Sequence, residues 1–231
     1  MEFATPRLPA LMLALTLCLT ACGGEKKVED PIPPELATVE AAAETGYDAA
    51  LAADRARITA AANLANSGWA DYSRRATTDG APAVALAATT AALAQLSTLV
   101  SANAAPLVIA RAFNAVSAPM ARIYAVYKPP VPENLLDMDY LGRELRLEGR
   151  AADLPRATTN LDILTSQWTA FRGRVVAVGG TSQAVQMDST LTRARSAIAA
   201  NDLAALETAA IAQAEAVDAV EALFASLDAP D

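Results

Sequence analysis

The chain has 231 residues, of which 53% are hydrophobic, only 5% are aromatic and none is histidine. Without histidine, Ser-His-Asp triads, Cys-His nucleophiles and imidazole-bound zinc are excluded. The net charge is −8, and nucleic-acid recognition begins with basic patches, so we expect no nucleic-acid partner.

Residues 1–21 have the pattern of an export signal. Arg7 supplies a positive charge, and the apolar run 8–19 is too short to span a bilayer. The run ends in Leu19-Thr20-Ala21-Cys22, which resembles the lipobox of bacterial lipoproteins. The resemblance implies that the signal is removed just before Cys22 and that this cysteine is acylated, for example with palmitate, as the membrane anchor.

The resemblance also implies a location. The residue after the anchor is Gly23, whereas an aspartate there is the inner-membrane retention signal of Gram-negative lipoproteins. We therefore expect a chain anchored to the outer membrane by lipid and facing the periplasm. Residues 22–34 combine glycine, charge and proline, which predicts a lipidated tether that reaches at most about 40 Å. Because Cys18 leaves with the signal, we expect no disulfide within a monomer.

The mature chain shows an internal repeat. Trp69 and Trp168 are the only tryptophans, and they are 99 positions apart. At the same offset, further residues match, namely Pro31-Ile32-Pro33 with Pro130-Val131-Pro132, Leu36 with Leu135, Asp54 with Asp153, Arg57 with Arg156, Tyr72 with Phe171, Arg75 with Arg174 and Gly80 with Gly179. We predict a tandem duplication, with helical repeat 1 at 31–129 and helical repeat 2 at 130–228. The two tryptophans are better interpreted as paired core anchors than as ligand-stacking groups.

Prolines, glycines and capping residues divide each repeat into four helical stretches. The predicted helices are 35–52, 54–78, 82–101 and 106–127 in repeat 1, and 132–151, 153–178, 182–200 and 202–227 in repeat 2. The predicted fold is all-α, a duplicated four-helix unit that gives two four-helix bundles or one eight-helix domain. This architecture is similar to that of the imelysin-like periplasmic proteins. Their histidine motif has no counterpart here, so no function is carried over from them.

The two repeats differ in charge. Repeat 1 has seven acidic and seven basic residues, whereas repeat 2 has fourteen acidic residues and eight arginines. Within repeat 2, Tyr140, Glu144 and Glu148 recur every four residues and share one helix face. Asp188 lies at a seam-like position of a later helix, with Arg195 two turns further along.

If these five residues converge, they form a candidate site for a cation or a small polar ligand. In the alternative interpretation, which we favour, Asp139 pairs with Arg143, Arg195 neutralises Asp188, and Glu144 and Glu148 face water. The sequence identifies no particular metal and predicts no cofactor.

Two functions remain after these exclusions. The leading hypothesis is a non-catalytic outer-membrane lipoprotein whose periplasm-facing helical domain binds a protein or an envelope component. The alternative is a lipoprotein that binds a small ligand or a cation through carboxylates of repeat 2. No dinucleotide or phosphate-binding motif is present, and aromatic residues are too few for a typical sugar-binding cleft, so we do not expect an enzyme.

Overall fold

The computed structural model describes residues 32–227. The predicted signal, the anchor at Cys22 and most of the tether lie outside these residues. Within them, every regular element is a helix, which confirms the all-α class. The first half of the chain holds α1 (Pro34–Leu51), α2 (Arg55–Ala76), α3 (Ala83–Ser101), α4 (Pro106–Ser117) and α5 (Met120–Tyr124). The second half holds α6 (Asn134–Ala151), α7 (Leu154–Ala177), α8 (Thr181–Ala199) and α9 (Leu203–Leu227).

The same turn features recur at the predicted interval of 99 residues. Asp54 and Asp153 each accept a hydrogen bond from the amide three residues later, at 3.1 and 3.2 Å, and so cap α2 and α7. Gly80 and Gly179 both have a φ of 90°, which glycine adopts without steric cost. These matches agree with a duplicated plan, although the duplication itself stays a prediction.

One predicted helix is interrupted. The sequence pattern predicts a continuous helix over 106–127, but α4 ends at Ser117 and the short α5 begins at Met120. Pro119 lies between them, and proline both lacks an amide proton and clashes with the preceding turn of a helix. The corresponding stretch of the second half has no proline, and α9 runs without a break.

Each half has its own hydrophobic core. Trp69 belongs to the first core and Trp168 to the second, with 7% and 2% of their surfaces exposed. This burial confirms that they are core residues. Their indole N–H groups donate to Thr90 Oγ1 at 3.1 Å and to Asp188 Oδ1 at 2.7 Å. Leu147 of the second half lies in the first core, so the two cores adjoin along α6.

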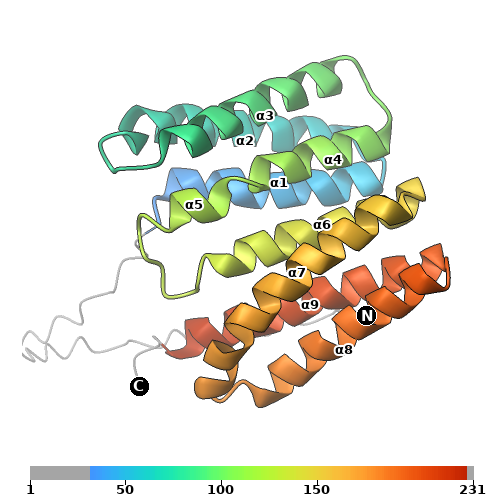
Figure 1. Ribbon diagram of the computed structural model, residues 1–231. Helices are drawn as coiled ribbons and strands as arrows, with labels where there is room; N and C mark the ends of the chain where they lie inside the picture. Colours follow the sequence, from blue (N-terminus) through green and yellow to red (C-terminus); the bar gives the residue numbers. More distant parts are fainter. Residues whose placement is uncertain (1–31, 228–231) are drawn as a thin grey trace, which may run out of the picture.

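Figure 1 shows the helices in stacked layers, with α2 and α3 at one side, then α1 and α4, then α6, and finally α8 and α9. The helix α6 is central, and almost all of its side chains from Leu141 to Gly149 are buried. In contrast, α3 is an outer helix that is long and apolar enough to span a membrane, and only a small share of its residues is buried. Because α6 carries many charges, the centre of the molecule combines burial with ionic groups.

Candidate functional site

A proline-rich stretch at 129–132 precedes α6 and sets where the helix begins, because proline disfavours helix at and before its own position. The helix then packs closely against α9. A β-carbon at Gly142 would clash with the Gln213 side chain, whose Nε2 donates to the Met138 carbonyl at 3.2 Å. Glycine at this position therefore allows α9 to lie against α6.

A groove of about 250 Å³ lies where α1, α6 and α9 meet, and we name it the acidic groove. Its lining includes Gly142 of α6 and the apolar side chain of Ile211 on α9. Carboxylates outnumber guanidinium groups among its lining side chains. The charged residues are Glu44 and Asp48 from α1, Asp139, Arg143 and Arg146 from α6, and Glu215 and Asp218 from α9.

The arginines of the groove are already engaged. Arg143 lies 2.6 Å from Asp139 and 3.1 Å from Glu44, and Arg146 lies 3.3 Å from Glu207 and 3.9 Å from Asp48. Within the described part of the chain, neither Glu215 nor Asp218 forms an ion pair. These two exposed carboxylates leave the groove with uncompensated negative charge.

The pKa values of the groove carboxyl groups reflect this excess. Burial raises the pKa of Asp139 to about 6 even though Arg143 opposes it. Partial desolvation together with repulsion from Glu44 and Glu215 raises the pKa of Asp218. The pKa of Glu221, one helical turn beyond Asp218, is raised to about 7, mainly by burial and by Asp139. Each raised pKa means that ionising the carboxyl group costs more free energy in the folded protein than it does in water.

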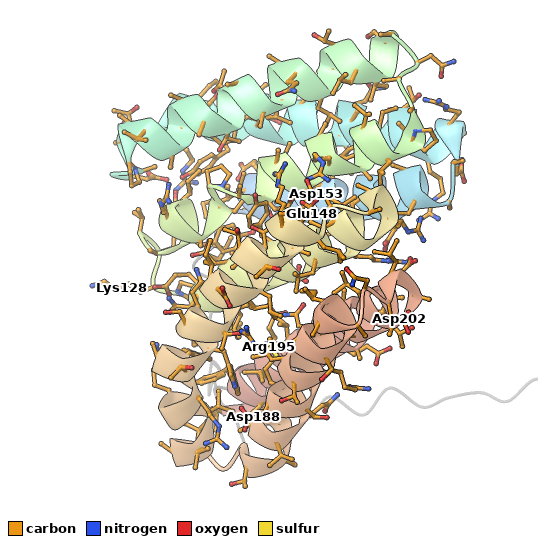
Figure 2. The ribbon with its side chains drawn as sticks, turned by 45° about the vertical axis from the view of Figure 1, so that its right-hand side comes forward. Lys128, Glu148, Asp153, Asp188, Arg195 and Asp202 are labelled. Carbon is orange, nitrogen blue, oxygen red and sulfur yellow. The ribbon has the colours of Figure 1, made fainter. Side chains whose placement is uncertain are left out.

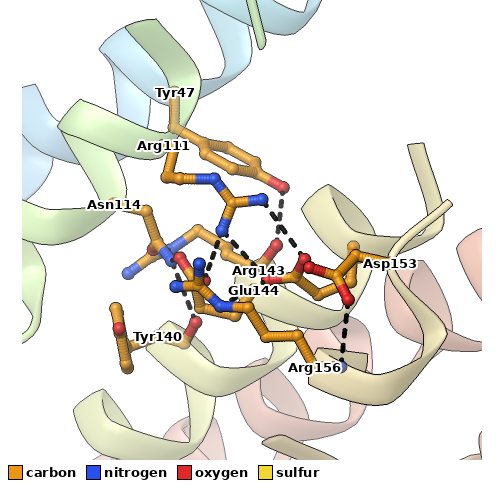
Figure 3. Close-up of polar contacts among 9 residues, drawn as sticks. Tyr47, Arg111, Asn114, Tyr140, Arg143, Glu144, Asp153 and Arg156 are labelled. Atoms are coloured by element: carbon orange, nitrogen blue, oxygen red, sulfur yellow. Dashed lines mark hydrogen bonds and ion pairs between the residues drawn. The ribbon is translucent and has the colours of Figure 1, made fainter. Parts of the chain in front are cut away.

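A second group of charges lies on the other side of α6, and Figure 3 shows how its side chains converge. Glu148 is fully buried and binds Arg111 at 2.9 Å and Arg156 at 3.1 Å. Glu144, only 2% exposed, binds the same two arginines at 2.9 and 3.3 Å and accepts a hydrogen bond from Asn114 at 2.8 Å. We name Arg111, Glu144, Glu148 and Arg156 the balanced cluster, because its two positive charges match its two negative charges.

The predicted site residues are therefore divided between two places. Glu144 and Glu148 belong to the balanced cluster, and Tyr140 lies beside it, where its carbonyl accepts a hydrogen bond from Asn114 at 3.1 Å. Asp188 and Arg195 line a separate hollow of about 330 Å³ between α7 and α8. Figure 2 shows Asp188 and Glu148 at opposite ends of the second half, so the five residues do not form one site.

Two details of the favoured interpretation are wrong. Glu144 and Glu148 do not face water, because helices α4 and α7 bring arginines over them. Arg195 does not neutralise Asp188. Arg195 lies 2.9 Å from Asp162, whereas Asp188 binds Arg172 at 2.9 Å and accepts from Trp168. The pairing of Asp139 with Arg143 is confirmed.

Sequence reasoning missed Glu44, Glu215 and Asp218 as groove residues. One signal was present for the first of them. Glu44 and Arg143 are 99 residues apart, so they occupy equivalent positions of the predicted repeats and carry opposite charges. No local spacing connects either residue to Glu215 and Asp218 on α9, and only the packing of α9 against α6 brings them together.

Among the described residues, no group of three or more aspartate, glutamate, cysteine or histidine side chains is arranged to hold a metal ion. Comparison with known proteins finds no matching family, no matching curated protein and no matching solved structure.

Proposed function

We propose that the chain is a non-catalytic, lipid-anchored lipoprotein of the outer membrane, and that its periplasm-facing helical domain binds a cationic group in the acidic groove. The observation that carries the proposal is the pair Glu215 and Asp218, which face the groove without a basic partner in the described part of the chain. The anchor rests on the lipobox that ends at Cys22.

The chemistry of the groove specifies the ligand class. Carboxylates stand beside apolar surface from Ile211 and from two alanines of α9, together with Tyr47. Such a lining suits an amine or guanidinium group on an aliphatic stem, since the stem covers apolar surface while the charge meets carboxylates. The source is either a basic segment of a partner protein or a small polyamine-type component of the envelope.

The hollow between α7 and α8 is a weaker candidate for the same role. Its two charged residues, Asp188 and Arg195, are each bound to a partner of opposite charge, Arg172 and Asp162. A ligand there would have to displace an existing ion pair, whereas a cation in the acidic groove would not.

Calorimetric titration at low salt tests the groove with two probes, spermidine and an arginine-rich peptide. We expect saturable binding that weakens with added salt and that falls at least about tenfold in the Glu215→Gln/Asp218→Asn variant. Asp162→Asn/Asp202→Asn is the matched control, because it removes the same net charge away from the groove. Binding of the peptide alone indicates a protein partner, and binding of spermidine alone indicates a small ligand. If neither probe binds, or if both variants weaken binding equally, the groove is not the site.

The anchor is tested separately. Cells that express the full chain should incorporate labelled palmitate into it, and a Cys22→Ser variant should not. A variant that still acquires palmitate would contradict the lipoprotein assignment without bearing on the groove.

A further inference from the structure

The two halves of the molecule meet across charged side chains as well as apolar ones. On one side of α6, the balanced cluster joins α4 to α6 and α7. On the other side, Arg143 of α6 meets α1. We name this second contact the seam and define it by Glu40, Glu44, Asp139 and Arg143.

The seam is unbalanced, unlike the cluster opposite it. One guanidinium group, that of Arg143, lies 2.6 Å from Asp139, 3.1 Å from Glu44 and 3.4 Å from Glu40. Glu40 is only 5% exposed, and its Oε2 has no hydrogen-bond partner among the described residues. Three carboxyl groups thus share one positive charge, and two of them, Glu40 and Asp139, have little contact with water, whereas Glu44 is exposed.

We propose that the seam is a pH-sensitive latch: α1 stays held against α6 while the seam carboxyl groups are protonated, and this side of the first half swings away from α6 and α9 when these groups ionise. The balanced cluster is the pivot of this movement, because it holds α4, on which α1 packs, to α6 and because its charges cancel. Separation of α1 from α9 would also widen the acidic groove, since Glu44, Asp139 and Arg143 belong to both features.

The charged and titratable groups around the seam, and their hydrogen-bond partners Asn114 and Ser117, come from four helices. These are Glu40, Glu44, Tyr47 and Asp48 from α1, Asn114 and Ser117 from α4, Asp139, Arg143 and Arg146 from α6, and Glu215, Asp218 and Glu221 from α9. Acidic side chains dominate this set, so ionisation adds like charges at short range.

The direction of the switch follows from the environment of Glu40 and Asp139. Burial raises the pKa of Glu40 to about 7 and that of Asp139 to about 6, although Arg143 lowers both. Because an opened seam would return these groups to water, where carboxyl pKa values are near 4, a rise in pH through this range favours the open form. The latch is therefore closed in mild acid and open above neutrality.

Distances between spin labels in the full chain test the latch directly. Cys18→Ser and Cys22→Ser leave no native thiol, so labels can be placed at Ala41→Cys on α1 and Ala222→Cys on α9. Between about pH 5 and about pH 8.5, a range that spans the raised pKa values, we expect this distance to lengthen by several ångströms and its distribution to broaden. A second pair, Val108→Cys on α4 and Thr158→Cys on α7, spans the balanced cluster and should stay constant.

The seam carboxyl groups are tested by substitution. Glu40→Gln/Asp139→Asn should remove the pH response of the α1–α9 distance, whereas Glu207→Gln, a surface acid bound by Arg146 and Arg150, should preserve it. If the double variant does not fold, Glu40→Gln alone should at least halve the response. A constant α1–α9 distance, an unchanged response in the seam variants, or equal lengthening of the α4–α7 pair would each overturn the proposal.

Discussion

Glu148 lies at the centre of the balanced cluster, with none of its side chain exposed and a guanidinium group on each side. Removing a charged group from such a place leaves its partners with charges that no longer match. The stability of the cluster therefore depends on every one of its members. The loss of one residue from an exposed ion pair matters less, because water solvates the remaining charge.

We expect Glu148→Gln to lower the free energy of unfolding by about 3 kcal/mol, because Arg111 and Arg156 would then face only one carboxylate. Asp162→Asn, which breaks the exposed pair with Arg195, should cost less than about 1 kcal/mol. Urea denaturation of both variants gives the comparison. Equal losses would show that the cluster is no more important than a surface pair.

Gly142 marks the closest approach of α6 and α9. Gly142→Ala should cost about 1–3 kcal/mol, since the new methyl group meets the Gln213 side chain. Gly173→Ala is the matched control in α7. It has open space around it and should gain roughly 0.5–1 kcal/mol from helix propensity.

A second substitution checks whether contact with Gln213 causes the loss of stability in Gly142→Ala. Replacing Gln213 with alanine in the Gly142→Ala background should recover part of the loss. No recovery would mean that the clash is not with Gln213.

The sequence predicted local pairs better than distant ones. Asp139 and Arg143 are four residues apart on one helix, and their contact follows from helical geometry. Arg111 lies 33 residues before Glu144, so no helical spacing relates them. For that reason helical spacing alone leaves Glu144 and Glu148 facing water, whereas packing of α4 over α6 buries them.

At the scale of elements, the helices begin and end close to the residues that cap or break a helix. Predicted and observed bounds agree within one or two residues where a capping aspartate, a proline or a glycine pair marks the end, as at α2, α3 and α8. The exception is the break at Pro119. There the apolar spacing continues through the proline, so periodicity alone suggested one helix.

The two capping aspartates give an element-scale prediction. Asp54→Ala and Asp153→Ala should each lower the free energy of unfolding by about 1 kcal/mol, because one amide at the start of α2 or α7 loses its acceptor. The asparagine variants keep an acceptor and should retain most of the stability. Chemical denaturation of the four proteins provides the test, and a loss confined to one position would argue that the two caps are not equivalent.

At the scale of the whole molecule, the sequence predicted an excess of acid in the second half but not where it gathers. Arginines from both halves neutralise the balanced cluster, whereas the excess remains at the seam and the acidic groove. That distribution depends on which helices pack together, and a helical pattern does not specify its neighbours.

The excess of acidic groups at the seam makes the stability of the protein depend on pH. The pKa of Glu40 is about 7 in the folded protein and near 4.5 when unfolded, so the folded state binds more protons between these values. Stability should therefore fall by about 3 kcal/mol from this group as pH rises from about 4.5 to about 7. Urea denaturation across this range checks the sign. The Glu40→Gln variant should show a flatter profile, and a wild-type stability that increases over the range would contradict the assignment.

Below about pH 4.5, stability falls again as the pH decreases. Arg172 holds the pKa of Asp188 below its usual value, and Tyr127 together with Arg75 does the same for Asp79. These groups contribute stability that is lost as acid protonates them. Maximal stability is consequently expected in mild acid.

The central claim is that the acidic groove binds a cationic group, and the amide resonances of two glycines test it most directly. Gly142 lies in the groove, whereas Gly173 is exposed on α7. In a two-dimensional ¹H–¹⁵N spectrum recorded during a spermidine titration, the Gly142 resonance should shift and saturate while that of Gly173 stays in place. If neither resonance moves, or if both drift together without saturation, the groove is not a binding site for cations.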